Sequence, residues 1–513
     1  MIRSLLTVSS GTLASRLLGF LRDSMIAALL GTGMIADAFL VAFQLVNVAR
    51  RLLSEGALNA ALVPAWLRLR QTDGEAAAAF AGRVLGTVSA ALFAVTMLAG
   101  LVMPVIVTAL APGFAGHETL QLAVNDARLM LPYLAFAGPA TVLLALASAQ
   151  GRFVLTAFSP LLFNIALIAV MIALIVTRQE GGIVAPVLAA TVGIAGFLQL
   201  SVLALWRGER VATPLRISFD KDMRGFLARA IPGMVASSAP QLLIVAGAII
   251  ASSSPSAVSW LYFANRLIEL PLGIVSVAMG TVLIPELTRA LHGANRSAIA
   301  SAESHALELA AGLALPAMLG LIVLSEPIVR LLFEHGAFSA SDTRSTAQAL
   351  IWLALGLPAH VLVKALSPAF FAREDTMAPL LATLKGIIVA VVFAVVLGHF
   401  HGASGIAAAI AIGAWSNAAS LIRHGRTTFG FSLDAMARRR LPRILIAALL
   451  MGGLLWLAAG VVIGSGSHRL VQAIILFALI AAGIVAYGLL LAAFRVANLR
   501  DLVNSIRPRD LSQ

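Results

Sequence analysis

Long hydrophobic stretches alternate with short polar or glycine-rich segments along almost the whole chain. A helix needs roughly 20 apolar residues to cross the hydrocarbon core of a bilayer, so this pattern predicts an all-α membrane protein. Segments such as GTG (31–33), APG (111–113) and SSSPS (252–256) separate the stretches. The fourteen predicted spans are 5–30, 36–62, 84–110, 122–148, 154–177, 183–205, 230–252, 257–287, 306–324, 345–371, 377–398, 403–422, 444–463 and 470–494.

Composition supports a membrane protein. Hydrophobic residues make up 60% of the 513 positions and charged residues only 12%, whereas a soluble domain carries about 25% charged residues. The first span begins Met-Ile-Arg and is too long and too polar for a cleaved signal peptide, so we expect it to be retained. The absence of cysteine excludes disulfides and thiolate metal sites.

Basic residues are distributed unevenly between the predicted loops. With a cytoplasmic N-terminus, 24 Lys and Arg residues fall on the cytoplasmic side and 8 inside spans. Only four fall on the other side: Arg178, Arg330, Arg344 and Arg469. This bias follows the positive-inside rule and places both termini in the cytoplasm. The net charge of +13 is therefore mainly a topology signal and does not point to nucleic acid.

A weak internal repeat predicts two lobes. Pro64 and Pro285 end similar segments, and the same offset of 221 positions aligns Phe39 with Trp260. Duplicated lobes are common in transporters, with the substrate site near the membrane midplane. We predict an N-lobe (1–206, spans 1–6), a basic cytoplasmic linker (207–229), a C-lobe (230–422, spans 7–12), a second basic linker (423–443) and two additional helices with a tail (444–513).

Charged residues inside spans 1, 2 and 8 are the strongest functional signal. A central Arg facing lipid costs roughly 2.5–3.5 kcal/mol, so such residues are expected to face each other, water or a charged ligand. Helical spacing places several of them on one polar stripe in each span, as with Arg16 and Asp23 in span 1, while others lie beside a stripe, as Arg50 does in span 2. The residues are the arginines Arg16, Arg22, Arg50, Arg51 and Arg266, the acids Asp23, Asp37, Glu55 and Glu269, and the polar residues Ser15, Asn47 and Asn265.

Structural roles for these charges are an alternative. Arg50 with Glu55, or Arg266 with Glu269, could form pairs that lock helices together, and Arg22–Asp23 could snorkel towards a helix end. However, one carboxylate cannot pair well with both Arg50 and Arg51. Clustered guanidinium groups suit bidentate phosphate recognition, so we interpret the stripes as an anion cavity and a diphosphate as a good match.

Several segments resemble the MurJ (MviN) family of lipid II flippases. They are ASRLLGFLRD (14–23), GTGMIADAFLVAF (31–43), NVARRLLSEGALNAALVP (47–64), YFANRLIELPLGIVSVAMGTVLIPEL (262–287) and KALSPAFFAREDTMAP (364–379). The resemblance covers the full chain and implies the multidrug/oligosaccharidyl-lipid/polysaccharide exporter fold. It also departs from the family pattern: Val46 replaces a common Pro, and Asn265 replaces a common acid.

The resemblance implies that the protein flips an undecaprenyl-diphosphate-linked peptidoglycan precursor from the cytoplasmic to the periplasmic leaflet of the inner membrane. By matching positions, the five arginines would be essential cavity residues, and Asp37, Glu55 and Glu269 their acidic partners in gating. Spans 13 and 14 would form a groove for the lipid tail. Membrane lipids and other cell-wall synthesis proteins would be its partners.

Other functions were weighed against this one. A flippase for another polyprenyl-linked glycan would use the same arginines, and a non-transporting scaffold for envelope-synthesis enzymes would not need them. A drug or cation antiporter would favour an acidic cavity. The sequence lacks a Walker motif and helical HxxH spacing, so we expect neither an enzyme, nor a metal site, nor a cofactor.

Overall fold

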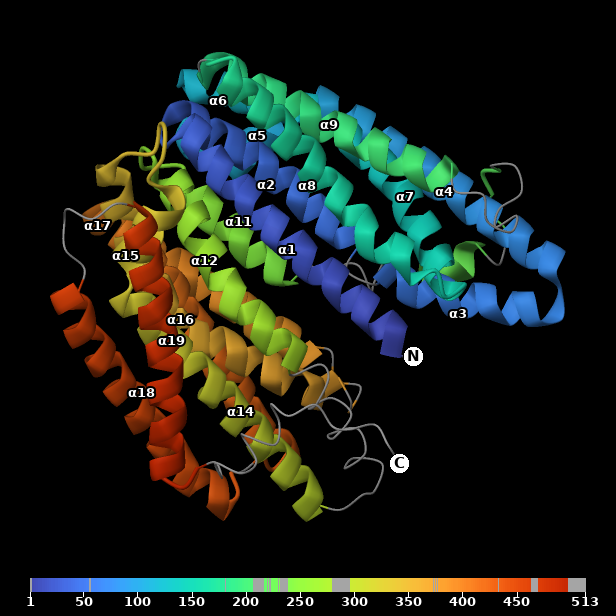
Figure 1. Ribbon diagram of the computed structural model, residues 1–513. Helices are drawn as coiled ribbons and strands as arrows, with labels where there is room; N and C mark the ends of the chain where they lie inside the picture. The colour runs from blue at the N-terminus through green and yellow to red at the C-terminus, as the bar shows by residue number, and fades with distance from the viewer. Residues whose placement is uncertain are drawn as a thin grey trace. The chain divides into compact units, whose positions relative to one another are not determined.

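The computed structural model describes a protein built from α-helices (Figure 1). The structure describes residues 2–54, 57–179, 181–205, 216–218, 220, 223–228, 230, 239–278, 296–371, 373, 375, 377–431, 433–462 and 469–496. Glu55 and most of the predicted linker 207–229 lie outside the described residues, as does the repeat's Pro285.

The helices fall into two compact units. Unit 1 comprises residues 1–262 and 333–339, and unit 2 comprises residues 263–332 and 340–513. Unit 1 contains α1 (Ile2–Leu30), α2 (Met34–Ser54), α3 (Ala57–Thr72), α4 (Gly74–Leu101), α5 (Met103–Leu110), the 3-10 turn η1 (Pro112–Phe114), α6 (Glu118–Met130), α7 (Pro132–Ala149), α8 (Phe153–Val176), α9 (Gly181–Leu205) and α11 (Ala239–Ala251). Helix α12 (Ala257–Ala278) begins in unit 1, and unit 2 contains the rest of it with α14 (Arg296–Val323), α15 (Ser325–Phe333), α16 (Ala340–Phe371), α17 (Met377–Phe429), α18 (Ala435–Val462) and α19 (Arg469–Ala493).

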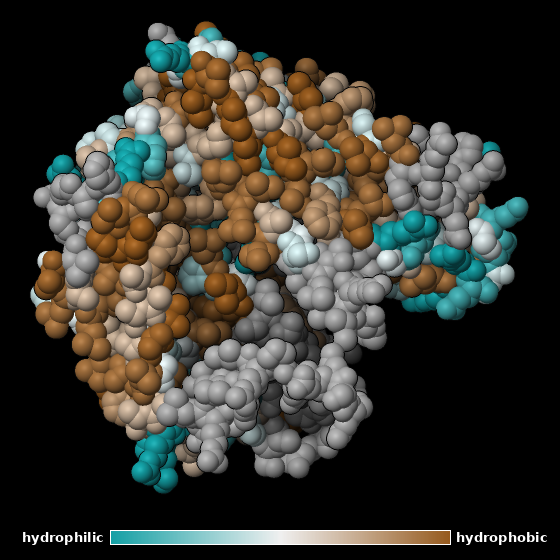
Figure 2. Space-filling model, viewed as in Figure 1, coloured by the Kyte–Doolittle hydropathy of each residue, from teal (hydrophilic) through white to brown (hydrophobic). Residues whose placement is uncertain are grey.

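Nine stretches among the described residues are long and apolar enough to cross a membrane. Many of their large apolar side chains are exposed, including Leu101, Val176 and Leu205, each at least three-quarters exposed. Figure 2 shows hydrophobic residues over much of the visible helical surface, with hydrophilic residues at the turn between α3 and α4. Exposed apolar surface of this extent requires lipid rather than water, and the chain is a multi-pass membrane protein. Helices α1, α2 and α12, which carry the polar stripes, are not among the nine.

Some predicted span boundaries were wrong. The predicted span 84–110 is interrupted at Val102, and helix α3 continues to Thr72, ten residues beyond the end of the predicted span 36–62. Pro104 near the start of α5 explains the interruption at Val102, because proline is tolerated in the first turn of a helix but not in its interior. The boundary between the predicted spans 377–398 and 403–422 agrees with the structure, because α17 consists of two helices that meet at a kink with non-helical backbone at Gly402.

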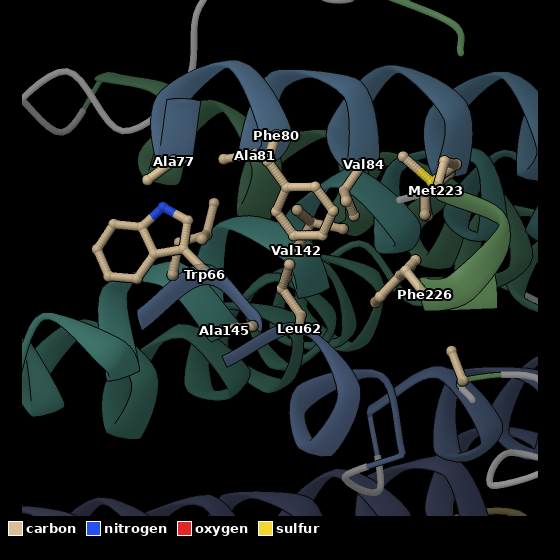
Figure 3. Close-up of a cluster of buried hydrophobic side chains, with 13 residues drawn as sticks. Leu62, Trp66, Ala77, Phe80, Ala81, Val84, Val142, Ala145, Met223 and Phe226 are labelled. Carbon is tan, nitrogen blue, oxygen red and sulfur yellow. The ribbon is translucent and has the colours of Figure 1, made fainter. Parts of the chain in front are cut away.

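The helices of unit 1 are held together by close packing. Helix α1 packs along α8, α2 along α6, and α7 along α9. Figure 3 shows a second contact region, in which Trp66 of α3 and Phe80 of α4 pack with Met223 and Phe226. The described residues Met223, Phe226 and Ala230 therefore pack onto α3 and α4.

Within each unit, contacts join predicted loops that are assigned to the same side of the membrane. In unit 1, the backbone N–H of Gly113 donates to the Ser252 hydroxyl at 3.0 Å, and that of Ala337 donates to the Ala28 carbonyl at 2.8 Å. These contacts join odd-numbered predicted loops or the helix ends beside them. Further along the chain, Arg83 of α4 forms an ion pair with Asp220, with Nε and a carboxylate oxygen 3.2 Å apart.

Unit 2 groups its even-numbered loops in the same way. Arg373 lies 3.0 Å from Glu303, and the backbone N–H of Asp434 donates to the Ser304 hydroxyl at 3.0 Å. These residues flank the predicted loops 8, 10 and 12. Grouping of alternate loops is the pattern expected for a chain that crosses the membrane repeatedly. In the same unit, α18 packs against α14 and α19 around Met451 and Leu455.

Candidate functional site

Arg22 and Asp23 form a buried charged pair in the C-terminal third of α1. Arg22 is 6% exposed and Asp23 is fully buried. The Arg22 Nη2 and Nε atoms lie 2.6 and 2.9 Å from Asp23 Oδ1. Burial excludes the alternative that Arg22 snorkels to the membrane surface. The pair is locally neutral, which limits the cost of placing either charge in the protein interior.

Asn164 of α8 completes the environment of Arg22. Its side-chain carbonyl accepts from Arg22 Nη1 at 3.0 Å, and its amide donates to the backbone carbonyl of Ser15 at 3.3 Å. Asn164 therefore links α8 to α1 at two positions, the Arg22 side chain and the Ser15 backbone. The predicted site residue Ser15 is half-buried and contributes its backbone to this contact.

Two arginines share one aromatic ring. The guanidinium carbon of Arg22 lies 5.7 Å from the centre of the Phe163 ring, and that of Arg50 lies 5.5 Å from it. Arg22 also lies 4.9 Å from the ring centre of Phe43. Both distances to the Phe163 ring centre fall within the roughly 6 Å over which a cation is attracted to an aromatic face. The structure therefore brings the predicted residues Arg22 and Arg50 together.

Arg50 differs from Arg22 in its partners. Its Nη2 donates to the side-chain carbonyl of Asn47 at 3.3 Å, and its guanidinium also bonds to the Tyr133 hydroxyl. Among the described residues no carboxylate pairs with Arg50. Arg51 follows it directly and is half-buried. Arg50 is thus a positively charged group held by neutral residues.

Asp37 contacts the start of α12. Its Oδ1 accepts from the backbone N–H of Ser259 at 2.9 Å and also from the Ser259 hydroxyl. The Tyr262 hydroxyl, one turn further, donates to Asp23 at 3.3 Å. Both acids predicted for α1 and α2 are therefore bonded to the part of α12 that belongs to unit 1.

The remaining predicted site residues are dispersed. Arg266 pairs with Glu269 at 2.7 Å within α12, in unit 2, as the alternative of structural pairs anticipated. Asn265 beside them is half-buried. Arg16 is exposed on α1. The predicted roles of Arg16, Arg51 and Asn265 in binding stay predictions.

Sequence reasoning missed four residues that contact the site arginines: Phe43, Tyr133, Phe163 and Asn164. Asn164 is a polar residue in the otherwise apolar stretch 154–177, and Tyr133 is one of only three tyrosines in the chain. Both could have been noticed on that ground. Phe163 is one of 24 phenylalanines, and nothing in the sequence distinguishes it.

Comparisons with known proteins identify the family. Residues 26–477 match the family model described as lipid II flippase MurJ. A probable lipid II flippase MurJ of Rhizobium meliloti is 36% identical over 522 residues, covering 99% of this chain and 96% of its own. The chain belongs to the lipid II flippase MurJ family. Within this family, the lipid II flippase MurJ of Burkholderia cenocepacia is 32% identical and covers 89% of this chain and 90% of its own.

Solved structures confirm the fold predicted from the resemblance. A lipid II flippase MurJ in an inward closed conformation aligns with a TM-score of 0.80 at 24% identity, covering 97% of this chain and all of that chain. An inward-facing multidrug resistance MATE family transporter of the MOP superfamily aligns with a TM-score of 0.67 at 16% identity, covering 84% of this chain and 95% of its own. At these identities the likeness concerns the fold alone, which is that of a transporter.

Proposed function

We propose that this protein moves lipid II, an undecaprenyl-diphosphate-linked disaccharide-peptide, from the cytoplasmic to the periplasmic leaflet by alternating access. Family membership supports the substrate and the direction of transport. The observation that carries the proposal is Arg50, a cation in a membrane helix whose described partners are all neutral. Its charge is available for an anionic ligand.

The arrangement of the arginines assigns different roles to them. Arg22 already donates to Asp23 and Asn164, so a substrate diphosphate would have to compete with Asp23 for it. Arg50 faces no such competition among the described residues. Hydrogen bonds to charged groups contribute about 1.5–3 kcal/mol each, and a guanidinium can bind a phosphate in bidentate fashion. The diphosphate is therefore expected to engage Arg50 first, with Arg51 beside it.

The acids have a different role in the proposal. Asp37 is bonded to Ser259, and Glu269 is paired with Arg266. A conformational change that moves α12 relative to α2 must break the Asp37 contact, and one that frees Arg266 for substrate must break the Glu269 pair. Exchange of these partners couples binding to movement. Glu55, which lies outside the described residues, is proposed to act in the same way.

We place the protein in the bacterial inner membrane with both termini in the cytoplasm. The bias of basic residues towards even-numbered loops supports this orientation. The grouping of odd-numbered loops in unit 1 and even-numbered loops in unit 2 agrees with the order of the spans. The loop contacts support the assignment of alternate loops to the same side of the membrane. The basic residues support the assignment of the even-numbered loops to the cytoplasm.

The proposal is tested in cells depleted of their own lipid II flippase. Wild type is expected to restore growth, and Arg50→Ala to leave lipid II accumulated in the cytoplasmic leaflet. Arg68→Ala is the matched control, because Arg68 is an exposed arginine of α3 outside the site. Membrane levels of all three proteins are measured in parallel. Rescue by a well-expressed Arg50→Ala variant equal to wild type would contradict the proposal.

A flippase for another polyprenyl-linked glycan is the second candidate. The contacts around Arg50 recognise a diphosphate and carry no information about the sugar or the peptide. Competition between lipid II and other undecaprenyl-diphosphate glycans for the purified protein would separate the two. Stronger binding of a different glycan than of lipid II would favour the second candidate.

A further inference from the structure

Three aromatic residues form a support beneath the site arginines. Phe43 of α2, Tyr133 of α7 and Phe163 of α8 are each almost fully buried. The Phe43 and Phe163 rings are stacked with centres 6.4 Å apart, and Tyr133 meets Phe163 edge-on at 5.4 Å. We refer to these three residues as the aromatic platform. Its rings hold each other in place, so the orientation of Phe163 is fixed from two sides.

The aromatic platform contacts both Arg22 and Arg50. Phe163 lies within cation–π distance of both guanidinium groups, Phe43 contacts Arg22, and the Tyr133 hydroxyl bonds to Arg50. Arg22 and Arg50 are also close enough for their charges to act on each other. Two like charges in a poorly solvated site repel each other strongly. An attraction from a shared ring offsets part of that repulsion.

A ring attracts a cation without neutralising it. A carboxylate in the place of Phe163 would hold the arginines more tightly, but it would also cancel the charge that an anionic ligand needs. Asn164 behaves similarly, because it accepts from Arg22 through a neutral amide and is itself oriented by its bond to the Ser15 carbonyl. Because Asp23 already pairs with Arg22, positioning by neutral groups leaves Arg22, Asp23 and Arg50 together with one net positive charge.

We propose that Phe163 and Asn164 are positioning residues that hold Arg22 and Arg50 at the spacing needed for a diphosphate without adding a second carboxylate to the one that Asp23 already provides. This inference rests on the proposed function, because it concerns the same ligand. Neither residue is expected to touch the substrate. Both act through the arginines, one by its ring face and the other by its side-chain carbonyl.

The role of the ring is tested with Phe163→Leu and Phe163→Tyr. Leucine keeps an apolar side chain and removes the aromatic face, whereas tyrosine keeps the face. The matched control is Phe80→Leu, since Phe80 is equally buried, lies in the cluster of Figure 3 and packs edge-on against Phe226. The measured quantities are the thermal midpoint and the Kd for undecaprenyl diphosphate, with undecaprenyl monophosphate as a second ligand.

Phe163→Leu is expected to weaken diphosphate binding by about 10-fold, and Phe163→Tyr to retain most of the affinity. Phe80→Leu is expected to lower the thermal midpoint without changing the Kd. Equal loss of affinity in Phe163→Leu and Phe80→Leu would show that the ring acts through packing alone and would overturn the inference. So would wild-type affinity in Phe163→Leu.

The requirement for an uncharged side chain at position 164 is tested with Asn164→Asp. The substitution keeps the size and the acceptor oxygen but adds a negative charge next to Arg22; it also removes the amide that donates to the Ser15 carbonyl, a loss that the control below reproduces at another buried amide. We expect a thermal midpoint close to wild type and a clear loss of diphosphate affinity, a combination that damage to packing would not produce. The control is Gln199→Glu, because Gln199 is a buried amide of the same unit that donates to the Ser159 hydroxyl at 2.8 Å. Unchanged diphosphate affinity in Asn164→Asp would overturn the inference.

Binding of the two ligands by the wild-type protein distinguishes failure of this inference from failure of the proposed function. If wild type binds the diphosphate no better than the monophosphate, the proposed recognition of a diphosphate fails. If wild type prefers the diphosphate and both Phe163→Leu and Asn164→Asp retain that preference, only the positioning role fails.

Discussion

Asp37 caps the start of α12 from a different helix: its carboxylate accepts from both the backbone N–H and the hydroxyl of Ser259, the third residue of α12. The first N–H groups of a helix have no partner within it, and a negative charge near them is favourable. The contact joins residues 222 positions apart. It fixes the entry of α12 against α2.

Loss of this contact is predicted to destabilise the protein. Asp37→Ala leaves the Ser259 N–H buried without its acceptor, which costs about 1–3 kcal/mol. Ser259→Ala removes only the hydroxyl and keeps the backbone bond, so its effect is expected to be smaller. The thermal midpoint of purified protein measures both. A midpoint for Asp37→Ala equal to or above that of Ser259→Ala would contradict the capping role.

The loop 333–339 is predicted to depend on Gly336. This glycine has a φ of 56°, and a Cβ atom there would lie 2.2 Å from the Ala28 carbonyl oxygen. Gly336→Ala is therefore expected to displace the loop and break the bond between Ala337 and Ala28. Gly116 has a φ of 81° with nothing within 4 Å of an added Cβ, so Gly116→Ala carries a similar backbone cost, about 1–2 kcal/mol, without the clash.

The two glycine variants are compared by thermal midpoint and by limited proteolysis of the loop 333–339. Gly336→Ala is expected to lose more stability than Gly116→Ala and to be cleaved faster. Equal stability of the two variants would show that the loop accommodates a side chain and that the close approach to Ala28 is not required.

The proposed membrane orientation predicts that thiols introduced in two loops react differently with a reagent outside the cell. The chain has no cysteine, so a single introduced thiol gives an unambiguous signal. Gly116→Cys lies in a loop assigned to the periplasm, and Thr72→Cys at the end of α3 in a loop assigned to the cytoplasm; both positions are exposed. A thiol reagent that cannot cross the membrane is expected to label intact cells at position 116 only. Labelling at position 72 instead would reverse the topology.

Most of the helices could be predicted from the sequence because hydropathy is a local property. A run of apolar residues between glycine- or proline-rich turns must form a helix in lipid, since its backbone has no other hydrogen-bond partners. Helix ends were less predictable. Val102 interrupts a continuous apolar run, and the cause, Pro104, lies inside a stretch that hydropathy treats as uniform.

The candidate site was predictable only in part, for a physical reason. Arg22 and Asp23 are sequence neighbours, and spacing along α2 placed Asn47 near Arg50, so these contacts follow from helical periodicity. The contacts of Arg22 with Asn164 and of Arg50 with Tyr133 join different helices. Their formation depends on how α7 and α8 are rotated against α1 and α2, which a single sequence does not specify.

The central claim is that the charge of Arg50, which pairs with no carboxylate among the described residues, is required to move a lipid-linked diphosphate. The most direct measurement is translocation of lipid II by purified protein in liposomes, comparing wild type, Arg50→Ala and Arg68→Ala at equal amounts of inserted protein. Loss of a hydrogen bond to a charged group corresponds to a fall of more than about 10-fold, which we expect for Arg50→Ala, with Arg68→Ala equal to wild type. Translocation by Arg50→Ala at the wild-type rate would contradict the account.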